Sequence, residues 1–169
     1  MKEPFIDMYD RFFNNVYRYV YSKLGNKWDT DDVVSEVFRK AFERFSTLQE
    51  DSNAKAWLMT IARHTIIDFY RKKKDNVTGE ILEQLVHEES FEAKLEIDDD
   101  IECLKKSMSY LPEEDQELIK LKYFAELKYK EIGYVVGKSE DALKTRVFRL
   151  LKKVGILVKK CIEGVGTNG

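Results

Sequence analysis

The spacing of apolar residues constrains this fold more than any other feature of the sequence. Over most of the chain, apolar residues recur every three or four positions, which is the period of one face of an α-helix. Proline, which interrupts helices, occurs only at positions 4 and 112 among 169 residues. The many Glu, Lys and Leu residues also favour helices. We therefore expect an all-α fold.

The first 74 residues predict a compact unit of three helices. Gly25 supplies a stop after the first helix, and Asp29 or Thr30 can cap the second. Residues 46–53 are polar and have no apolar period, so they predict a loop before the third helix. The expected helices cover about residues 5–24, 31–45 and 54–73.

The net charge of −2 hides an uneven distribution along the chain. Residues 75–109 carry a net charge of −8, whereas residues 1–74 and 110–169 each carry +3. Such an asymmetry is typical of domains joined by a charged connector. We therefore expect two small helical domains joined by an acidic linker, with the N-terminal domain over 1–74, the linker over 75–100 and the C-terminal domain over 101–169.

The C-terminal segment contains the pattern of a helix-turn-helix. A short helix over 129–136, a turn at Gly137 and a longer helix capped by Ser139 follow one another at the required spacing. In DNA-binding proteins the second helix of this motif enters the major groove. A plain helical hairpin with a solvated basic face fits the same pattern. If DNA is the partner, the candidate contacts are Ser139, Glu140, Ala142, Lys144, Thr145, Arg146 and Arg149.

The sequence lacks the motifs of common enzymes. There is no Gly-rich phosphate loop, no HExxH or GxSxG motif and no cluster with metal-ligand spacing. We therefore expect neither catalysis, nor a metal, nor a cofactor. Cys103 and Cys161 are far apart and lack CxxC or Cys/His spacing, so we expect reduced cysteines.

The N-terminal segment MKEPFIDMYDRFF carries acidic residues and no long apolar run, so it does not predict a signal peptide. No stretch of eighteen apolar residues occurs, so we expect no membrane insertion. These features favour a cytoplasmic protein.

Five segments in order resemble the extracytoplasmic-function (ECF) sigma factors of the bacterial sigma-70 family. They are DDVVSEVFRKAFERF, AWLMTIARHTIIDFYRKKKD, an acidic spacer, LPEEDQELIKLKYFAELKYKEIG and SEDALKTRVFRLLKKV. The resemblance implies a transcription initiation factor that binds core RNA polymerase, directs it to −35/−10 promoters and stabilises the melted −10 strand. It also implies control by an anti-sigma factor and a linker that threads the polymerase cleft, although a solvated tether has the same composition.

The resemblance also assigns roles to residues of the N-terminal unit. The loop before the third helix would hold a flipped base, and the basic helix would contact the opened strand, although a solvated helix end is the plainer interpretation. The implied −10 contacts are Thr47, Leu48, Gln49, Asp51, Ser52, Asn53, Arg63, His64, Arg71 and Lys72. The implied polymerase contacts on the second helix are Asp31, Asp32, Glu36, Arg39 and Lys40, which also fit an ordinary solvated face.

Three positions depart from the family pattern. His64 stands where asparagine is common, Gly133 where alanine is usual and Ala142 where threonine is common. These departures affect the expected base preferences. A stand-alone helix-turn-helix transcription regulator is the alternative function, but such regulators normally dimerise and the sequence has no obvious dimer surface.

Overall fold

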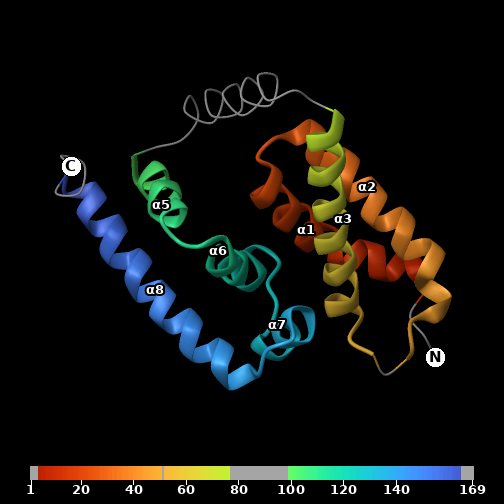
Figure 1. Ribbon diagram of the computed structural model, residues 1–169. Coiled ribbons are helices and arrows are strands. Elements are labelled where there is room, and N and C mark those ends of the chain that lie inside the picture. The colour runs from red at the N-terminus through yellow and green to blue at the C-terminus, as the bar shows by residue number, and fades with distance from the viewer. Residues whose placement is uncertain (1–3, 51, 77–98, 165–169) are drawn as a thin grey trace.

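The computed structural model describes residues 4–50, 52–76 and 99–164 (Figure 1). Within these ranges the chain is helical and has no strand, which confirms the expected all-α class. The acidic linker expected over 75–100 falls almost entirely outside the described residues. The elements are α1 (Phe5–Leu24), α2 (Lys27–Arg44), the 3₁₀ turn η1 (Phe45–Thr47), α3 (Ala54–Asn76), α5 (Asp99–Ser109), α6 (Glu113–Ile119), the π-helical turn η2 (Lys120–Phe124), α7 (Tyr129–Val136) and α8 (Glu140–Ile162).

The N-terminal unit consists of α1, α2 and α3, which pack on one another. Gly25 ends α1 in the left-handed conformation at φ 80°, as its position predicts. The expected cap of α2 at Asp29 or Thr30 is wrong. The cap is Asn26, because its side-chain Oδ1 accepts a hydrogen bond from Asp29 N at 2.9 Å and the helix therefore begins earlier.

The C-terminal unit consists of α5, α6, η2, α7 and α8. Pro112 precedes α6, where its missing N–H removes no helical hydrogen bond. Figure 1 shows α6 and α7 between the long helix α8 and the N-terminal bundle, and both α6 and α7 contact α8. This placement leaves α8 at the edge of the molecule, whereas α7 also contacts α3 of the N-terminal unit.

A disulfide joins Cys103 on α5 to Cys161 on α8, with 5.6 Å between the two Cα atoms. The expectation of two reduced cysteines is therefore wrong. The cysteines are 58 residues apart in sequence, but α5 packs along the C-terminal end of α8 and brings them together. Local motif spacing carries no information about such a long-range pair.

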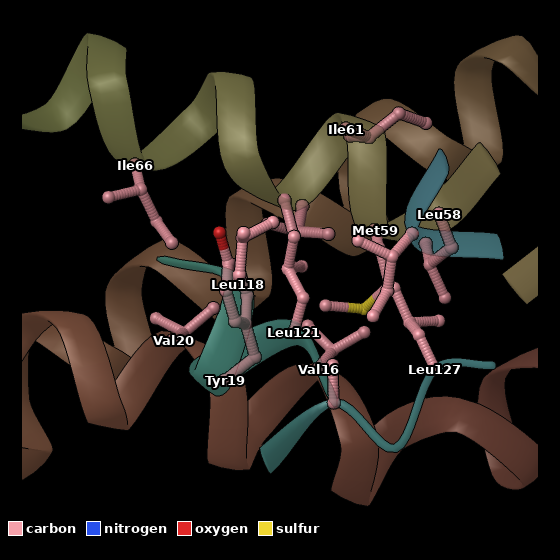
Figure 2. Close-up of a cluster of buried hydrophobic side chains, with 14 of the residues drawn as sticks. Val16, Tyr19, Val20, Leu58, Met59, Ile61, Ile66, Leu118, Leu121 and Leu127 are labelled. Carbon is pink, nitrogen blue, oxygen red and sulfur yellow. The ribbon is translucent and has the colours of Figure 1, made fainter. Parts of the chain in front are cut away.

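The apolar cores of the two units form one continuous cluster. Figure 2 shows side chains of α1 and α3 facing Leu118 of α6, Leu121 of η2 and Leu127 just beyond it. All of these side chains are almost fully buried. Burial of a leucine side chain contributes about 1.5–3 kcal/mol. The labelled residues from the N-terminal side are Val16, Tyr19, Val20, Leu58, Met59, Ile61 and Ile66.

Candidate nucleic-acid and polymerase interfaces

The helix-turn-helix forms as the sequence predicts. Gly137 ends α7 in the left-handed conformation at φ 74°. The hydroxyl of Ser139 then caps α8 by accepting a hydrogen bond from Ala142 N at 3.2 Å. Leu143 and Val147 are buried on the inner side of α8, so its outer side is free to face a ligand.

The start of α8 presents every candidate duplex contact at an exposed position. The side chain of Lys144 pairs with Glu140 one turn away, at 3.3 Å. No ion pair links Arg149 to another of the described residues, so its guanidinium is the most available cation on this face. The exposed candidates are Ser139, Glu140, Ala142, Lys144, Thr145, Arg146 and Arg149.

Arg146 differs from the other candidates because it is already paired. Its Nε donates to Asp115 Oδ1 of α6 at 2.7 Å, and its Nη2 lies 2.5 Å from the same oxygen. The Asp115 carboxylate raises the pKa of Arg146 above its usual value. Arg146 therefore ties α8 to α6, and contact with a phosphate would require it to share or leave this partner.

Phe148 was not among the residues singled out in the sequence. Its side chain is 59% exposed on α8, three residues after Thr145 and next to Arg149. The Lys152 ammonium lies 4.7 Å from the ring centroid, in a cation–π contact. The helical period places the buried residues of α8 at positions 143, 147, 150 and 154, and position 148 falls outside this set. An aromatic residue at such an outward position is the sequence signal that could have identified Phe148. An exposed aromatic ring on this face can contact a thymine methyl group.

The loop between α2 and α3 uses several of its polar side chains locally. The Thr47 hydroxyl donates to Arg44 O at 2.6 Å, and the Asn53 side chain caps α3 by accepting from Ala56 N at 2.9 Å. Leu48 is buried in the core. Gln49 is exposed and Ser52 is half-buried, which leaves them best placed to meet a base. Asp51 lies outside the described residues.

The candidate strand contacts on α3 divide between two environments. His64, Arg71 and Lys72 are exposed, and Arg71 lies 3.9 Å from Asp68 on the same helix. Arg63 instead faces the C-terminal unit, with its Nε 3.8 Å from Glu117 Oε1. His64, Arg71 and Lys72 therefore lie on the outer face of α3, whereas Arg63 lies at the contact between the two units.

The aromatic residues of α3 divide between the core and the surface. Trp57 and Phe69 are half-buried and pack against the core. Tyr70 is exposed, and its hydroxyl donates to Lys23 O at 2.6 Å. None of these rings projects from α3 as a free stacking platform.

The candidate polymerase face of α2 is a network of charges. Arg39 bonds to Glu36 and Glu43 on the neighbouring turns, and this pairing lowers the pKa of Glu36. Lys40 instead turns toward α3, 3.6 Å from Asp68. Asp31 and Asp32 are exposed, and Asp31 accepts a hydrogen bond from the Tyr17 hydroxyl at 3.2 Å.

Within the described ranges, no group of His, Cys, Asp and Glu side chains is arranged to hold a metal ion. Among the same residues, no helix is both long and apolar enough to span a membrane.

Comparisons with known proteins match both units. The family described as Sigma-70 region 2 matches residues 8–75, and the family described as Sigma-70, region 4 matches residues 101–154. The RNA polymerase sigma factor SigZ of Bacillus subtilis is 31% identical over 92% of this chain and 87% of its own length. The ECF RNA polymerase sigma factor SigM of the same organism is 29% identical over 93% of this chain and 96% of its own length.

The fold is also similar to a solved structure. This is the sigma factor RpoE in complex with the anti-sigma factor NepR from Bartonella quintana. The TM-score is 0.63 at 20% sequence identity, and the match covers 90% of this chain and 97% of that one. At 20% sequence identity, the similarity between the two structures establishes the fold alone.

Proposed function

Because the chain belongs to the extracytoplasmic-function sigma factors of the sigma-70 family, which act in transcription initiation, we propose that it binds core RNA polymerase and directs it to promoters with −35 and −10 elements. The observation that carries this proposal is the pairing of two different surfaces in one chain. One is the exposed start of α8 in a helix-turn-helix, and the other is the polar loop and basic face of α3.

The −35 element is read as duplex DNA by α8. The helix enters the major groove with its N-terminal half, where Thr145 and Arg149 reach base edges or phosphates. Phe148 adds an apolar surface on the same side. Lys144 and Arg146 lie nearer the flanks, where their intramolecular partners compete with phosphates.

The −10 element is held as a separated strand by the N-terminal unit. Opening a duplex costs about 1–2 kcal/mol per base-pair step, which must be recovered by contacts to the open strand. Gln49 and Ser52 line the position of a flipped base, while His64, Arg71 and Lys72 contact its neighbours and the backbone. No ATP or cofactor is needed for this step.

The proposed function also implies two protein partners for this chain, the polymerase and an anti-sigma factor. The charged face of α2 binds the polymerase. An anti-sigma factor, the kind of partner that is bound to RpoE in the similar structure, controls this chain. The polymerase carries out the chemistry, so this chain acts in the cytoplasm as a factor and not as an enzyme.

The first test is co-migration of the purified chain with bacterial core RNA polymerase on size exclusion at moderate salt, without DNA. We expect a stable one-to-one complex that initiates run-off transcription from a promoter carrying both elements. A chain that stays free or dimeric, yet binds duplex DNA, would instead identify a stand-alone regulator.

A variant with Gln49→Ala and Ser52→Ala tests the strand contacts. It should form the same complex but leave −10 thymines less reactive to permanganate, because the loop no longer holds the open strand. Glu50→Ala, an exposed loop position without an assigned contact, is the matched control. Undiminished thymine reactivity in the double variant would remove these two residues from the −10 site.

A further inference from the structure

The disulfide between Cys103 and Cys161 lies far from the residues of α8 that are proposed to read DNA. Figure 1 shows α5 beside the C-terminal part of α8, and the bond joins these two helices. At a rise of about 1.5 Å per residue, Cys161 lies about 24 Å along α8 from Thr145. The bond therefore acts on a part of the C-terminal unit that the proposed DNA contacts leave unused.

The cellular compartment gives this bond a chemical meaning. The glutathione and thioredoxin systems of the cytoplasm keep thiols reduced, so a cytoplasmic disulfide is usually a transient bond with a catalytic or redox-sensing role. The proposed function places this chain in the cytoplasm as a factor that is not an enzyme, and the inference rests on that function. Of the two roles, redox sensing is then the one that fits.

Solvent comes close to the bond. Cys161 is half-buried, whereas Cys103 is only 8% exposed. A groove of about 440 Å³ lies between α5 and α8, and two of its lining residues are Leu104 and Ile162, which directly follow the two cysteines in sequence. A small oxidant or reductant can therefore approach the bond while the chain stays folded, and Cys161 is the sulfur that it meets first.

Few other contacts hold α5 in place. This helix has 11 residues, and only Cys103 and Ser107 among them are buried. Ile101 and Leu104 are 46% and 45% exposed, so the helix buries little apolar area. Isolated helices of this length are marginal in water. The position of α5 therefore depends on its attachment to α8.

The C-terminal part of α8 is also weakly packed. Between positions 151 and 162, Val154 is the only buried residue, whereas the preceding part of the helix buries Leu143, Val147 and Leu150. Breaking the bond would loosen α5 and the last turns of α8. The recognition part of α8 would still be held by its own apolar contacts.

We propose that Cys103 and Cys161 form a reversible oxidation site, at which a peroxide makes the disulfide and a dithiol reductant breaks it. The oxidised site fixes α5 on α8, and the reduced site releases α5. The redox state of the pair thus changes the order of one end of the C-terminal unit and not the DNA sequence that the unit reads.

Oxidation begins at Cys161, the more exposed of the two thiols. Its thiolate attacks one oxygen of hydrogen peroxide, the O–O bond breaks, and the departing hydroxide takes up the thiol's proton as water, which leaves a sulfenic acid on Cys161. The Cys103 thiolate then attacks the sulfenic sulfur, the S–S bond forms, and the hydroxide that leaves becomes a second water. The two thiols lose two electrons, which reduce the peroxide.

Reduction runs by thiol–disulfide exchange. A thiolate of the dithiol attacks the Cys161 sulfur, and the Cys103 sulfur leaves as a thiolate that takes up a proton. The second thiol of the reductant then attacks its own sulfur in the mixed disulfide and displaces Cys161. The reductant ends as a disulfide, and both cysteines of the chain end as thiols.

The first measurement is the redox state of the full folded chain. The chain is reduced with dithiothreitol without denaturant, and part of it is then reoxidised with one equivalent of hydrogen peroxide. Maleimide labelling and mass spectrometry count the free thiols. We expect both cysteines to be labelled after reduction and neither after reoxidation, with the mass of a monomer.

Hydrogen exchange then follows the release of α5. We expect its amides to exchange about tenfold faster in the reduced chain, because α5 opens more often once it is detached. Helix α3 is the internal standard and should exchange equally in both forms. In the matched control with Cys103→Ser and Cys161→Ser, α5 should exchange at the reduced rate with and without peroxide, which excludes methionine oxidation as the cause.

Fluorescence anisotropy with a −35 duplex tests whether DNA reading is independent of the bond. The affinities of the oxidised and reduced chains should agree within about twofold, because distant sites act independently. Loss of duplex binding on reduction would overturn a switch that is confined to α5 and the end of α8.

Three further results would overturn the oxidation site. They are a bond that dithiothreitol leaves intact in the folded chain, thiols that peroxide converts to sulfinic acid or to bonds between chains, and equal exchange of α5 in both forms. Failure of the proposed function is a different outcome, because neither form would then bind polymerase or the duplex, whatever the exchange rate of α5.

Discussion

Gly133 lies where α7 comes closest to the turn that follows it. A Cβ atom at this position would lie 2.5 Å from the backbone oxygen of Lys138, a distance that neither group can relieve by rotating a side chain. The turn is therefore packed more closely against α7 than an alanine at position 133 would allow. A single missing methyl group thus sets the placement of α8 relative to α7.

Gly133→Ala should therefore destabilise the protein by about 1–3 kcal/mol, because the turn must shift to admit the methyl group. The control is Gly155→Ala. A methyl group at Gly155, inside α8, would meet no atom within 4 Å, so this change should stabilise the helix by about 0.5–1 kcal/mol. Urea unfolding measures both. Equal stability of Gly133→Ala and the wild type would contradict the close approach.

Single residues were also where sequence reasoning was least complete. It identified Gly25, Gly137 and Ser139 correctly, because caps and stops depend on neighbours within a few positions. It placed the α2 cap at Asp29 or Thr30, three or four residues late, since Asn, Asp and Thr are all good caps. It did not identify Glu117, which reads as one more acid in the acidic run LPEEDQE.

At the scale of elements, α8 presents two arginines of different character. Arg149 has no ion pair among the described residues, whereas Arg146 is held by Asp115. Arg149→Ala should weaken binding to −35 duplex and reduce the slope of log affinity against log salt by about 1, because fewer counterions are released.

Arg146→Ala provides the comparison for that measurement. It should change the salt slope less, since its charge is already matched by Asp115, but lower the stability of the C-terminal unit by removing a bond between α6 and α8. A salt slope unchanged by Arg149→Ala would exclude the phosphate contact. A larger slope change for Arg146 than for Arg149 would reverse the assignment.

The element most dependent on a covalent link is α5. Within it only Cys103 and Ser107 are buried, and Ile101 and Leu104 remain exposed. Reduction of the disulfide should therefore lower the free energy of unfolding by about 2–4 kcal/mol. Thermal melts with and without dithiothreitol measure the change, and Cys103→Ser with Cys161→Ser should make the melt insensitive to the reductant. A wild-type melt that ignores the reductant would show that the link adds no stability.

At the scale of the whole molecule, one core serves both units. Leu121 of η2 is fully buried among residues of α1 and α3. Leu121→Ala should cost about 2–5 kcal/mol. Hydrogen exchange should rise in α1 and α3 as well as in the C-terminal unit, because the lost contact is shared. Leu151→Ala, at a more exposed position of α8, should have a small effect. Faster exchange confined to the C-terminal unit would contradict a shared core.

The sequence was sufficient for the fold class and most helix boundaries because both follow from local periodicity and capping. It was not sufficient for the contacts between the N-terminal and C-terminal units or for the disulfide. Asn15 meets Ala125, and Cys103 meets Cys161, across long stretches of chain, and no local pattern specifies such meetings. The same limit explains Arg63, whose helix position is predictable but whose partner on α6 is not.

The disulfide also makes the C-terminal unit a covalent ring. The ring closes at Cys103 and Cys161, and it contains α6, α7 and most of α8. A protease that cuts the backbone once inside this ring cannot release a fragment until the sulfur bond is broken. A nicked chain would keep its full mass on a non-reducing gel, because the disulfide would still join the two fragments. A cut between α7 and α8 would therefore leave both helices in one covalently linked molecule.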